Sequence, residues 1–232
     1  MNFIKVFLFR ILKLLPLRNL ILFESHSDFC DNSRVLFEFM LSAGLNQKYR
    51  MIWLVEDPEA FQDRRISNVK FVRLVPESYL EKIKYYYYLS SARFAFYTHR
   101  SPPLKFNRGE VFINLWHGSG IKRPASLDMA RNFDYVLCSS DYFKEIRIRN
   151  FSIQADKLLP LGNPRNDLFF EEANALEKII DHKFSKVILW MPTFRATKNE
   201  RPEFINYNSQ SRALPIVDCD EKLKELDSFL TA

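Results

Sequence analysis

The sequence predicts an α/β fold built on a mostly parallel, doubly wound sheet. Short runs rich in β-branched and aromatic residues alternate with stretches of helical periodicity, an order that is typical of consecutive β-α-β units. The 232 residues, of which 47% are hydrophobic and 27% charged, suffice for a full core and exclude a disordered chain. A content of only 5 glycines excludes a collagen-like chain.

The predicted elements follow one another from residue 20 onward. The strands are expected at Leu20–Glu24, Arg50–Val55, Lys70–Leu74, Phe94–Thr98, Val111–Trp116, Tyr135–Ser139, Leu158–Leu161 and Lys186–Met191. The helices are expected at Ser33–Ala43, Glu77–Ser91, Ser140–Asn150, Glu171–Asp181 and Asp218–Leu230. Because ligands of such sheets bind beyond the carboxyl ends of the strands, the residues directly after each strand are the first candidates for a site.

The first residues are expected to form an amphipathic helix on a membrane surface. Over residues 2–15, Lys5, Arg10 and Lys13 gather on one side and phenylalanine and leucine side chains fill the other. The longest uncharged apolar run has four residues, far below the roughly 18 that span a bilayer. Pro16 ends the helix. The alternative is a first helix packed on the domain.

The charge balance favours an anionic partner. The chain has 34 Lys and Arg against 28 Asp and Glu, a net charge of +6, which suits lipid, nucleotide or polyanion. Nucleic acid is disfavoured because the basic residues are scattered and no basic helix occurs. No metal site or resident cofactor is expected, since the 3 cysteines lie far apart and no G-x-G-x-x-G or Walker A loop is present.

The strongest candidate site follows the strand predicted at Val111–Trp116. His117 titrates near neutrality and can take a proton from an attacking hydroxyl. The next residues form a glycine-rich, basic loop whose backbone amides and positive charge suit phosphate oxygens; it contains Gly118, Ser119, Gly120 and Lys122. The alternative is a tight turn with a structural histidine.

Two other loops after strands add polar side chains. Asn163, Arg165 and Asp167 follow the strand that starts at Leu158, and turn chemistry explains the asparagine but not the other two. Arg195 follows the last predicted strand, where its planar guanidinium can bind a phosphate or form a surface ion pair. His26 either contacts an acceptor or has no function, and no role is assigned to His99.

Five segments in this order resemble the CDP-glycerol glycerophosphotransferase family, the primases and polymerases of teichoic acid synthesis. They are Phe23–Leu41, Lys84–Thr98, Asn114–Arg123, Leu161–Asp167 and Met191–Arg195. The resemblance implies a GT-B fold of two Rossmann-like domains at the cytoplasmic face of the cell membrane. It also implies transfer of glycerol phosphate from CDP-glycerol, the donor substrate, to a hydroxyl of a lipid-linked or polymeric acceptor.

The resemblance also assigns residues. His117 matches the family's proposed catalytic base, Arg195 a donor-side position, and Asn163, Arg165 and Asp167 the loop between the domains. Glycerol, ribitol or another polyol as the donor group, and a primase or polymerase activity, stay open.

The resemblance divides the chain into three parts. These are the membrane-surface helix at 1–18, a Rossmann-like acceptor-side domain at 19–172, and the start of a donor-binding domain at 173–232. The family's second histidine and its Asp-Tyr-Ser-Ser stretch do not occur, so we expect a truncated member with an incomplete second sheet. Such a chain is active alone or with a missing half supplied in trans, or it is an inactive remnant that binds membrane or acceptor.

Overall fold

The computed structural model describes residues 11–100, 102, 105, 109–118, 132–171, 187, 189 and 219–231. The chain forms two compact units, Met1–Glu172 and Ala173–Ala232. In the second unit the helix α5 (Asp220–Thr231) is described, close to the helix predicted there. Most of the amphipathic segment 2–15, and nearly all of the elements predicted at Glu171–Asp181 and Lys186–Met191, lie outside the described residues. No helix in the described ranges is both long and apolar enough to cross a membrane.

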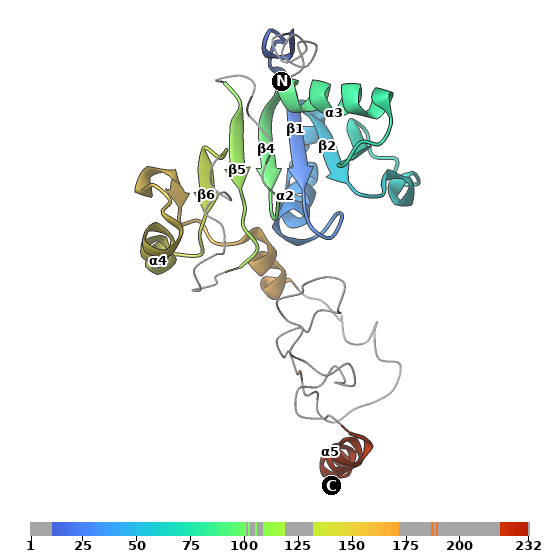
Figure 1. The fold of residues 1–232 in the computed structure, drawn as a ribbon, viewed down its shortest axis with the longest axis vertical. Coiled ribbons are helices and arrows are strands. Elements are labelled where there is room, and N and C mark those ends of the chain that lie inside the picture. Colours follow the sequence, from blue (N-terminus) through green and yellow to red (C-terminus); the bar gives the residue numbers. More distant parts are fainter. Residues whose placement is uncertain are drawn as a thin grey trace. The chain divides into compact units, whose positions relative to one another are not determined.

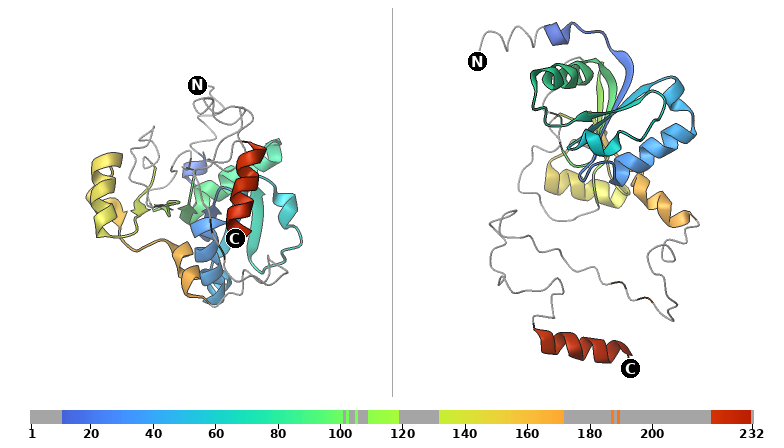
Figure 2. Two further views of the ribbon diagram at one scale, coloured as in Figure 1. Left: turned by 90° about the horizontal axis from the view of Figure 1, so that it is seen from below. Right: turned by 90° about the vertical axis from the view of Figure 1, so that its right-hand side faces the viewer.

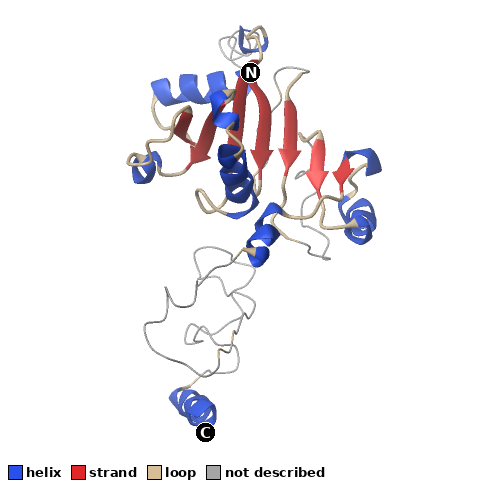
Figure 3. Cartoon of the chain, turned by 180° about the vertical axis from the view of Figure 1, so that it is seen from behind, coloured by secondary structure: helices blue, strands red, loops and turns tan. Residues whose placement is uncertain are grey.

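The first unit is built on a seven-stranded sheet with the order β3-β2-β1-β4-β5-β6-β7. Every neighbouring pair is parallel, and the arrows in Figure 3 accordingly point the same way. The strands are β1 (Arg18–Glu24), β2 (Arg50–Val55), β3 (Val69–Arg73), β4 (Ala92–Tyr97), β5 (Val111–Asn114), β6 (Tyr135–Leu137) and β7 (Leu158–Leu159). The predicted α/β, doubly wound fold is confirmed.

Helices cover both faces of the sheet (Figures 1 and 2). On one face Leu20 and Leu22 of β1 belong to a core cluster with side chains of α3 (Tyr79–Ser91) and the end of α4 (Asp141–Phe151). On the other face the alternate side chains of β1 pack with α2 (Asp31–Ser42). Because both faces are buried, the central strands are almost continuously apolar rather than alternating.

The strands near the carboxyl edge are shorter than the sequence predicts. The strand expected to reach Trp116 ends at Asn114, because Trp116 has a φ of 59°, in the left-handed region. Likewise β7 ends at Leu159, and Gly162, with a φ of 88°, turns the chain toward the short helix η5 (Pro164–Phe170). The residues lost from the strands form the loops at this edge.

Aromatic packing between β1, β2 and α2 forms the centre of one core cluster. The ring of Phe37 lies 5.4 Å from that of Phe23 and 5.5 Å from that of Trp53, in both cases edge-on. All three side chains have no exposed surface, and edge-on aromatic pairs add to the free energy of burial. This cluster fixes α2, and with it the first residues of that helix, against the sheet.

Replacing Phe37 tests this packing against a control on the same helix. Phe37→Ala should lower the free energy of unfolding by about 3–5 kcal/mol, because it leaves a cavity among rings that cannot close over it. Phe39→Ala should change it by less than about 0.5 kcal/mol, because Phe39 is 65% exposed. Urea unfolding followed by circular dichroism gives both values, and equal losses would contradict the assignment of Phe37 to the core.

Candidate functional site

The carboxyl edge of the sheet brings together loops that are far apart in the sequence. The strand order reverses between β1 and β4, the place where ligands bind in open α/β sheets. The residues that follow β1, β4, β5 and β7 meet at this edge, and His117 lies among them.

The turn after β5 is held by side chains from three other elements. The carbonyl oxygens of Leu115 and Trp116 accept hydrogen bonds from Nδ2 of Asn32, at 3.2 and 2.7 Å. The carbonyl of His117 accepts from Nη2 of Arg165 at 2.8 Å, and that of Gly118 accepts from Nη2 of Arg147 at 2.7 Å. Four successive carbonyl groups are therefore fixed, and the left-handed backbone at Trp116 is held in place.

His117 itself is half-buried and has a depressed pKa. Burial, which disfavours the charged imidazolium, lowers its pKa, and the positive charges of Arg147 and Arg165 act in the same direction. A hydrogen bond between the ring and the backbone of Thr98 and the charge of Asp31 oppose this shift. The ring is therefore neutral at pH 7. Its Nδ1 is buried and has no hydrogen-bond partner among the described residues, so a lone pair remains to accept a proton.

Three of the chain's 4 histidines lie in a row at this edge. The ring centroid of His99 lies 5.0 Å from that of His117 and 5.0 Å from that of His26. His26 and His99 are exposed, so the row runs from solvent to the half-buried His117. No role for His99 is predicted from the sequence, although its place directly after a strand is the same signal that identifies His117.

Glu24, the last residue of β1, is a buried carboxylate that the sequence analysis did not single out. It accepts hydrogen bonds from the backbone N–H groups of Thr98, His99 and Arg100 at 3.2–3.3 Å. Burial raises its pKa, while these hydrogen bonds act in the opposite direction. Glu24 thus fixes the turn that carries both His99 and the Thr98 backbone group bonded to His117. In the sequence, the signal that could have identified Glu24 is its place as a charged residue at the end of an apolar strand.

Arg165 connects the loop after β7 to the start of α2 and to His117. Its Nη1 lies 2.9 Å from Oδ1 of Asp31, and its backbone N–H donates to Oδ1 of Asn32 at 3.0 Å. Asn163 is buried and its Nδ2 lies 3.4 Å from Oγ of Ser139. Two of the three residues predicted in this loop therefore organise the site through contacts within the protein.

The other predicted residues have different outcomes. Asp167 is exposed on η5. A β-carbon at Gly118 would lie 3.6 Å from Nη2 of Arg165, an ordinary contact, so packing within the protein does not require glycine there. The remaining predicted residues lie outside the described part of the chain: Ser119, Gly120, Lys122 and Arg195. Within the described ranges no group of three or more histidine, cysteine or acidic side chains is arranged to hold a metal ion.

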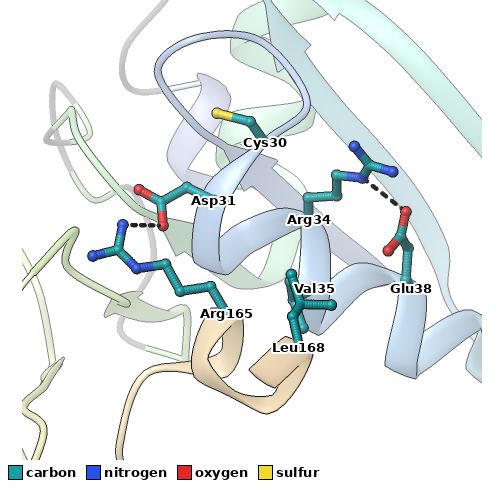
Figure 4. Close-up of a pocket in the computed structure, with 7 residues that line it drawn as sticks. All are labelled: Cys30, Asp31, Arg34, Val35, Glu38, Arg165 and Leu168. Atoms are coloured by element: carbon teal, nitrogen blue, oxygen red, sulfur yellow. Dashed lines mark hydrogen bonds and ion pairs between the residues drawn. The ribbon is translucent and has the colours of Figure 1, made fainter. Parts of the chain in front are cut away.

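An open pocket of about 480 Å³ lies beside this site (Figure 4). Its lining residues come from the start of α2 and from η5: Cys30, Asp31, Arg34, Val35, Glu38, Arg165 and Leu168. Two ion pairs are part of the lining, Asp31 with Arg165 and Arg34 with Glu38, while Val35 and Leu168 contribute apolar surface. The charged groups in the lining are thus balanced, and Arg165 belongs both to the pocket and to the turn at His117.

Asn32 is the residue on which the geometry of the turn depends most directly. Asn32→Asp would replace the donor Nδ2 by an oxygen facing two carbonyl groups, so the free energy of unfolding should fall by about 2–5 kcal/mol. Asn46→Asp is the matched control, because Nδ2 of Asn46 donates to Ser67 at an exposed hydrogen bond, and it should cost about 0.5 kcal/mol or less. Urea unfolding measures both, and similar small losses would contradict the role of Asn32.

This chain is similar to known proteins in its sequence and in its fold. The chain is 30% identical to a teichoic acid poly(glycerol phosphate) polymerase of Staphylococcus epidermidis, over 89% of this chain and 30% of that protein. It is 27% identical to a protein of the same description from Bacillus spizizenii, over 81% and 53%. The chain thus spans about half or less of the length of these relatives.

A solved structure of the wall teichoic acid polymerase TagF matches with a TM-score of 0.58 and 21% identity, over 75% of this chain and 48% of that one; this likeness concerns the fold. A model of the family described as CDP-Glycerol:Poly(glycerophosphate) glycerophosphotransferase matches residues 6–224, almost the whole chain. The chain therefore belongs to the CDP-glycerol:poly(glycerophosphate) glycerophosphotransferase family.

Proposed function

We propose that this chain provides the acceptor-side domain, with the general base His117, for transfer of glycerol phosphate from CDP-glycerol to a lipid-linked or polymeric hydroxyl in teichoic acid synthesis. The observation that carries the proposal is the neutral, half-buried imidazole at the carboxyl edge, with an unpartnered Nδ1. Family membership supports the class of reaction.

The proposed reaction is a displacement at phosphorus. The acceptor oxygen forms a bond to the phosphorus of glycerol phosphate, the bond from that phosphorus to the bridging oxygen breaks, and CMP leaves. The acceptor's hydroxyl proton passes to Nδ1 of His117. Because this atom is buried, the acceptor reaches it only after a small shift of the Trp116–Gly118 turn or of the ring. Arg165 orients His117 through the backbone carbonyl. Backbone amides of Gly118, Ser119 and Gly120 would face phosphate oxygens.

Charged side chains have separate parts in this proposal. Lys122 and Arg195 would neutralise the phosphates of the donor, as positive charges near a diphosphate do. Asn163 and Asp167 would shape the loop that leads out of the acceptor-side domain. No resident cofactor or metal takes part in these steps. A ribitol donor would use the same chemistry. Comparing the rates of transfer from CDP-glycerol and from CDP-ribitol identifies the donor.

A second candidate function is binding of membrane or acceptor without catalysis. It is supported by the exposed apolar side chains of Leu14 and Ile11, which suit attachment to a membrane without requiring catalysis. We therefore propose to assay transfer with the chain alone and with the donor-binding half of the Bacillus spizizenii relative added in trans. Transfer separates the two functions, because a chain without catalysis adds no transfer to that of the donor-binding half alone. Calorimetric titration of the chain alone with CDP-glycerol reports whether this chain binds the donor itself.

His117→Ala should lower kcat roughly 10²–10⁴-fold, the usual contribution of a positioned general base, with donor affinity nearly unchanged. Radiolabelled CDP-glycerol and a synthetic lipid-linked acceptor give kcat and KM. His182→Ala, which removes the fourth histidine of the chain, is the control and should match the parent. Arg195→Ala should instead weaken donor binding. If His117→Ala lost donor affinity but kept its turnover at saturation, His117 would be a binding residue and not the base.

The pH dependence follows from the depressed pKa of His117. Its base form predominates at pH 7, so kcat should change little above pH 7 and fall as the pH drops through a value below the usual 6.5. Because the folded protein binds this proton less readily than the unfolded chain, acidification through that range should also lower the free energy of unfolding. A rate that falls already above pH 7 would contradict this assignment.

We further propose that the first residues hold the protein at the cytoplasmic face of the cell membrane. The described end of this segment supports the proposal, since Leu14 is 82% exposed and Ile11 is 43% exposed, while Leu12 packs partly against the core. An anionic surface would attract Lys5, Arg10 and Lys13, and the exposed apolar side chains would enter the headgroup region.

Deletion of residues 2–15 should release the protein from vesicles that contain anionic lipid, because both the charge and the apolar surface lie in that segment. Sedimentation at moderate salt measures the bound fraction. Replacing Lys5, Arg10 and Lys13 by Gln is the matched variant, and it should reduce binding to anionic vesicles while keeping the apolar face. Equal sedimentation of the deletion variant and the parent would refute the membrane proposal.

A further inference from the structure

Arg147, in the second turn of α4, is one of the largest fully buried side chains of the described structure. It is 1% exposed and lies directly beneath the turn that carries His117. Its guanidinium carbon is 4.0 Å from the ring centroid of Trp116 and 4.3 Å from that of Phe151. The sequence analysis gave it no role, because an arginine in a helix is usually at the surface.

The guanidinium of Arg147 lacks the partners that a buried cation normally has. Nη2 donates to the carbonyl of Gly118, but Nε and Nη1 are buried without a hydrogen-bond partner among the described residues. No ion pair of Arg147 with a carboxylate occurs within the described ranges, and burial lowers its pKa to about 10. Buried charges are costly unless they are paired and hydrogen-bonded, so this arrangement reduces the stability of the ligand-free protein.

The charges around His117 leave a surplus positive charge at Arg147. The other arginine that acts on His117, Arg165, is neutralised by Asp31 at 2.9 Å. Arg147 has no such partner in the described structure, and three N–H groups, one on Nε and two on Nη1, lack acceptors. A phosphate supplies both the negative charge and the acceptor oxygens that are missing.

We propose that Arg147 binds a phosphate group of the substrate and thereby forms an anion subsite next to His117. This inference rests on the proposed function for the identity of the substrate, but not for the binding of phosphate. The N–H groups are buried, so binding requires a small shift of the Trp116–Gly118 turn or of the side chain. The phosphate belongs either to the diphosphate of the donor or to the glycerol phosphate unit of the acceptor.

The competing explanation is that Arg147 is structural and serves only to hold the Gly118 carbonyl and to stack between two rings. The two explanations predict opposite effects on the ligand-free protein. Replacing an uncompensated buried charge by an apolar side chain of similar length is neutral or stabilising when the charge exists for a ligand. It is destabilising when the charge holds the fold together.

The test compares Arg147→Met and Arg147→Lys with Arg149→Met, an exposed arginine on the same helix. Calorimetry and thermal unfolding of the whole chain are measured with pyrophosphate, for the donor, and with glycerol 3-phosphate, for the acceptor. The parent and Arg149→Met should bind one of these ligands and unfold at a higher temperature in its presence. Arg147→Met should unfold no lower than the parent without ligand, and its affinity should be at least about tenfold weaker. Arg147→Lys keeps the charge but loses the planar set of donors, so its affinity should lie between those of the parent and of Arg147→Met.

Three results would overturn the proposal. The first is a parent protein that binds neither ligand at millimolar concentration, and the second is an Arg147→Met variant that keeps the parent's affinity. The third is an Arg147→Met variant that folds but unfolds at a clearly lower temperature than the parent without ligand, as the structural explanation predicts. If Arg147→Met did not fold, the Arg147→Lys titration would decide, since unchanged affinity there also contradicts the proposal. Neither measurement requires transfer, so phosphate binding at Arg147 together with a failed transfer assay would refute the proposed function alone.

Discussion

The left-handed backbone at Trp116 is the constraint on which the site depends. A bulky aromatic residue adopts this conformation only where its surroundings enforce it, and here four successive carbonyl groups are held by side chains of Asn32, Arg165 and Arg147. The strained turn stops β5 two residues before the sequence pattern suggests and aims His117 across the edge of the sheet. Loss of the hydrogen bonds from Asn32 and Arg165 would let the backbone relax and would move the imidazole.

The topology of the sheet places the side chains that hydrogen-bond to this turn close to it. Because the strand order reverses beside β1, the start of α2 lies next to the ends of β4 and β5, and Asn32 can reach the turn. Glu24 fixes the neighbouring turn by accepting three backbone N–H groups. The buried polar groups at this edge therefore orient the turn that carries His117. The aromatic cluster around Phe37 anchors the helix from which Asn32 projects.

The sheet and the main candidate site residue, His117, could be predicted from the sequence. The buried side chains that hold the loops around His117 could not. Apolar runs and their spacing indicate strands, and a histidine directly after a strand indicates a site. Glu24 and Arg147 act through contacts with residues distant in the sequence, and no local pattern shows whether a charged side chain is buried. The strand predicted to reach Trp116 is too long, because the sequence pattern shows which residues are apolar. It does not show the side-chain hydrogen bonds to the backbone that end the strand at Asn114.

The contact between Asp31 and Arg165 joins residues 134 positions apart, and this separation determines the order in which the protein is completed during synthesis. Strands β1 to β4 lie within the first hundred residues and can pair as they leave the ribosome, because domains fold as their segments emerge. The turn at His117 lacks its hydrogen bond from Arg165 until the end of the first unit has been made. The nascent chain therefore acquires the first four strands of its sheet well before it acquires an ordered His117.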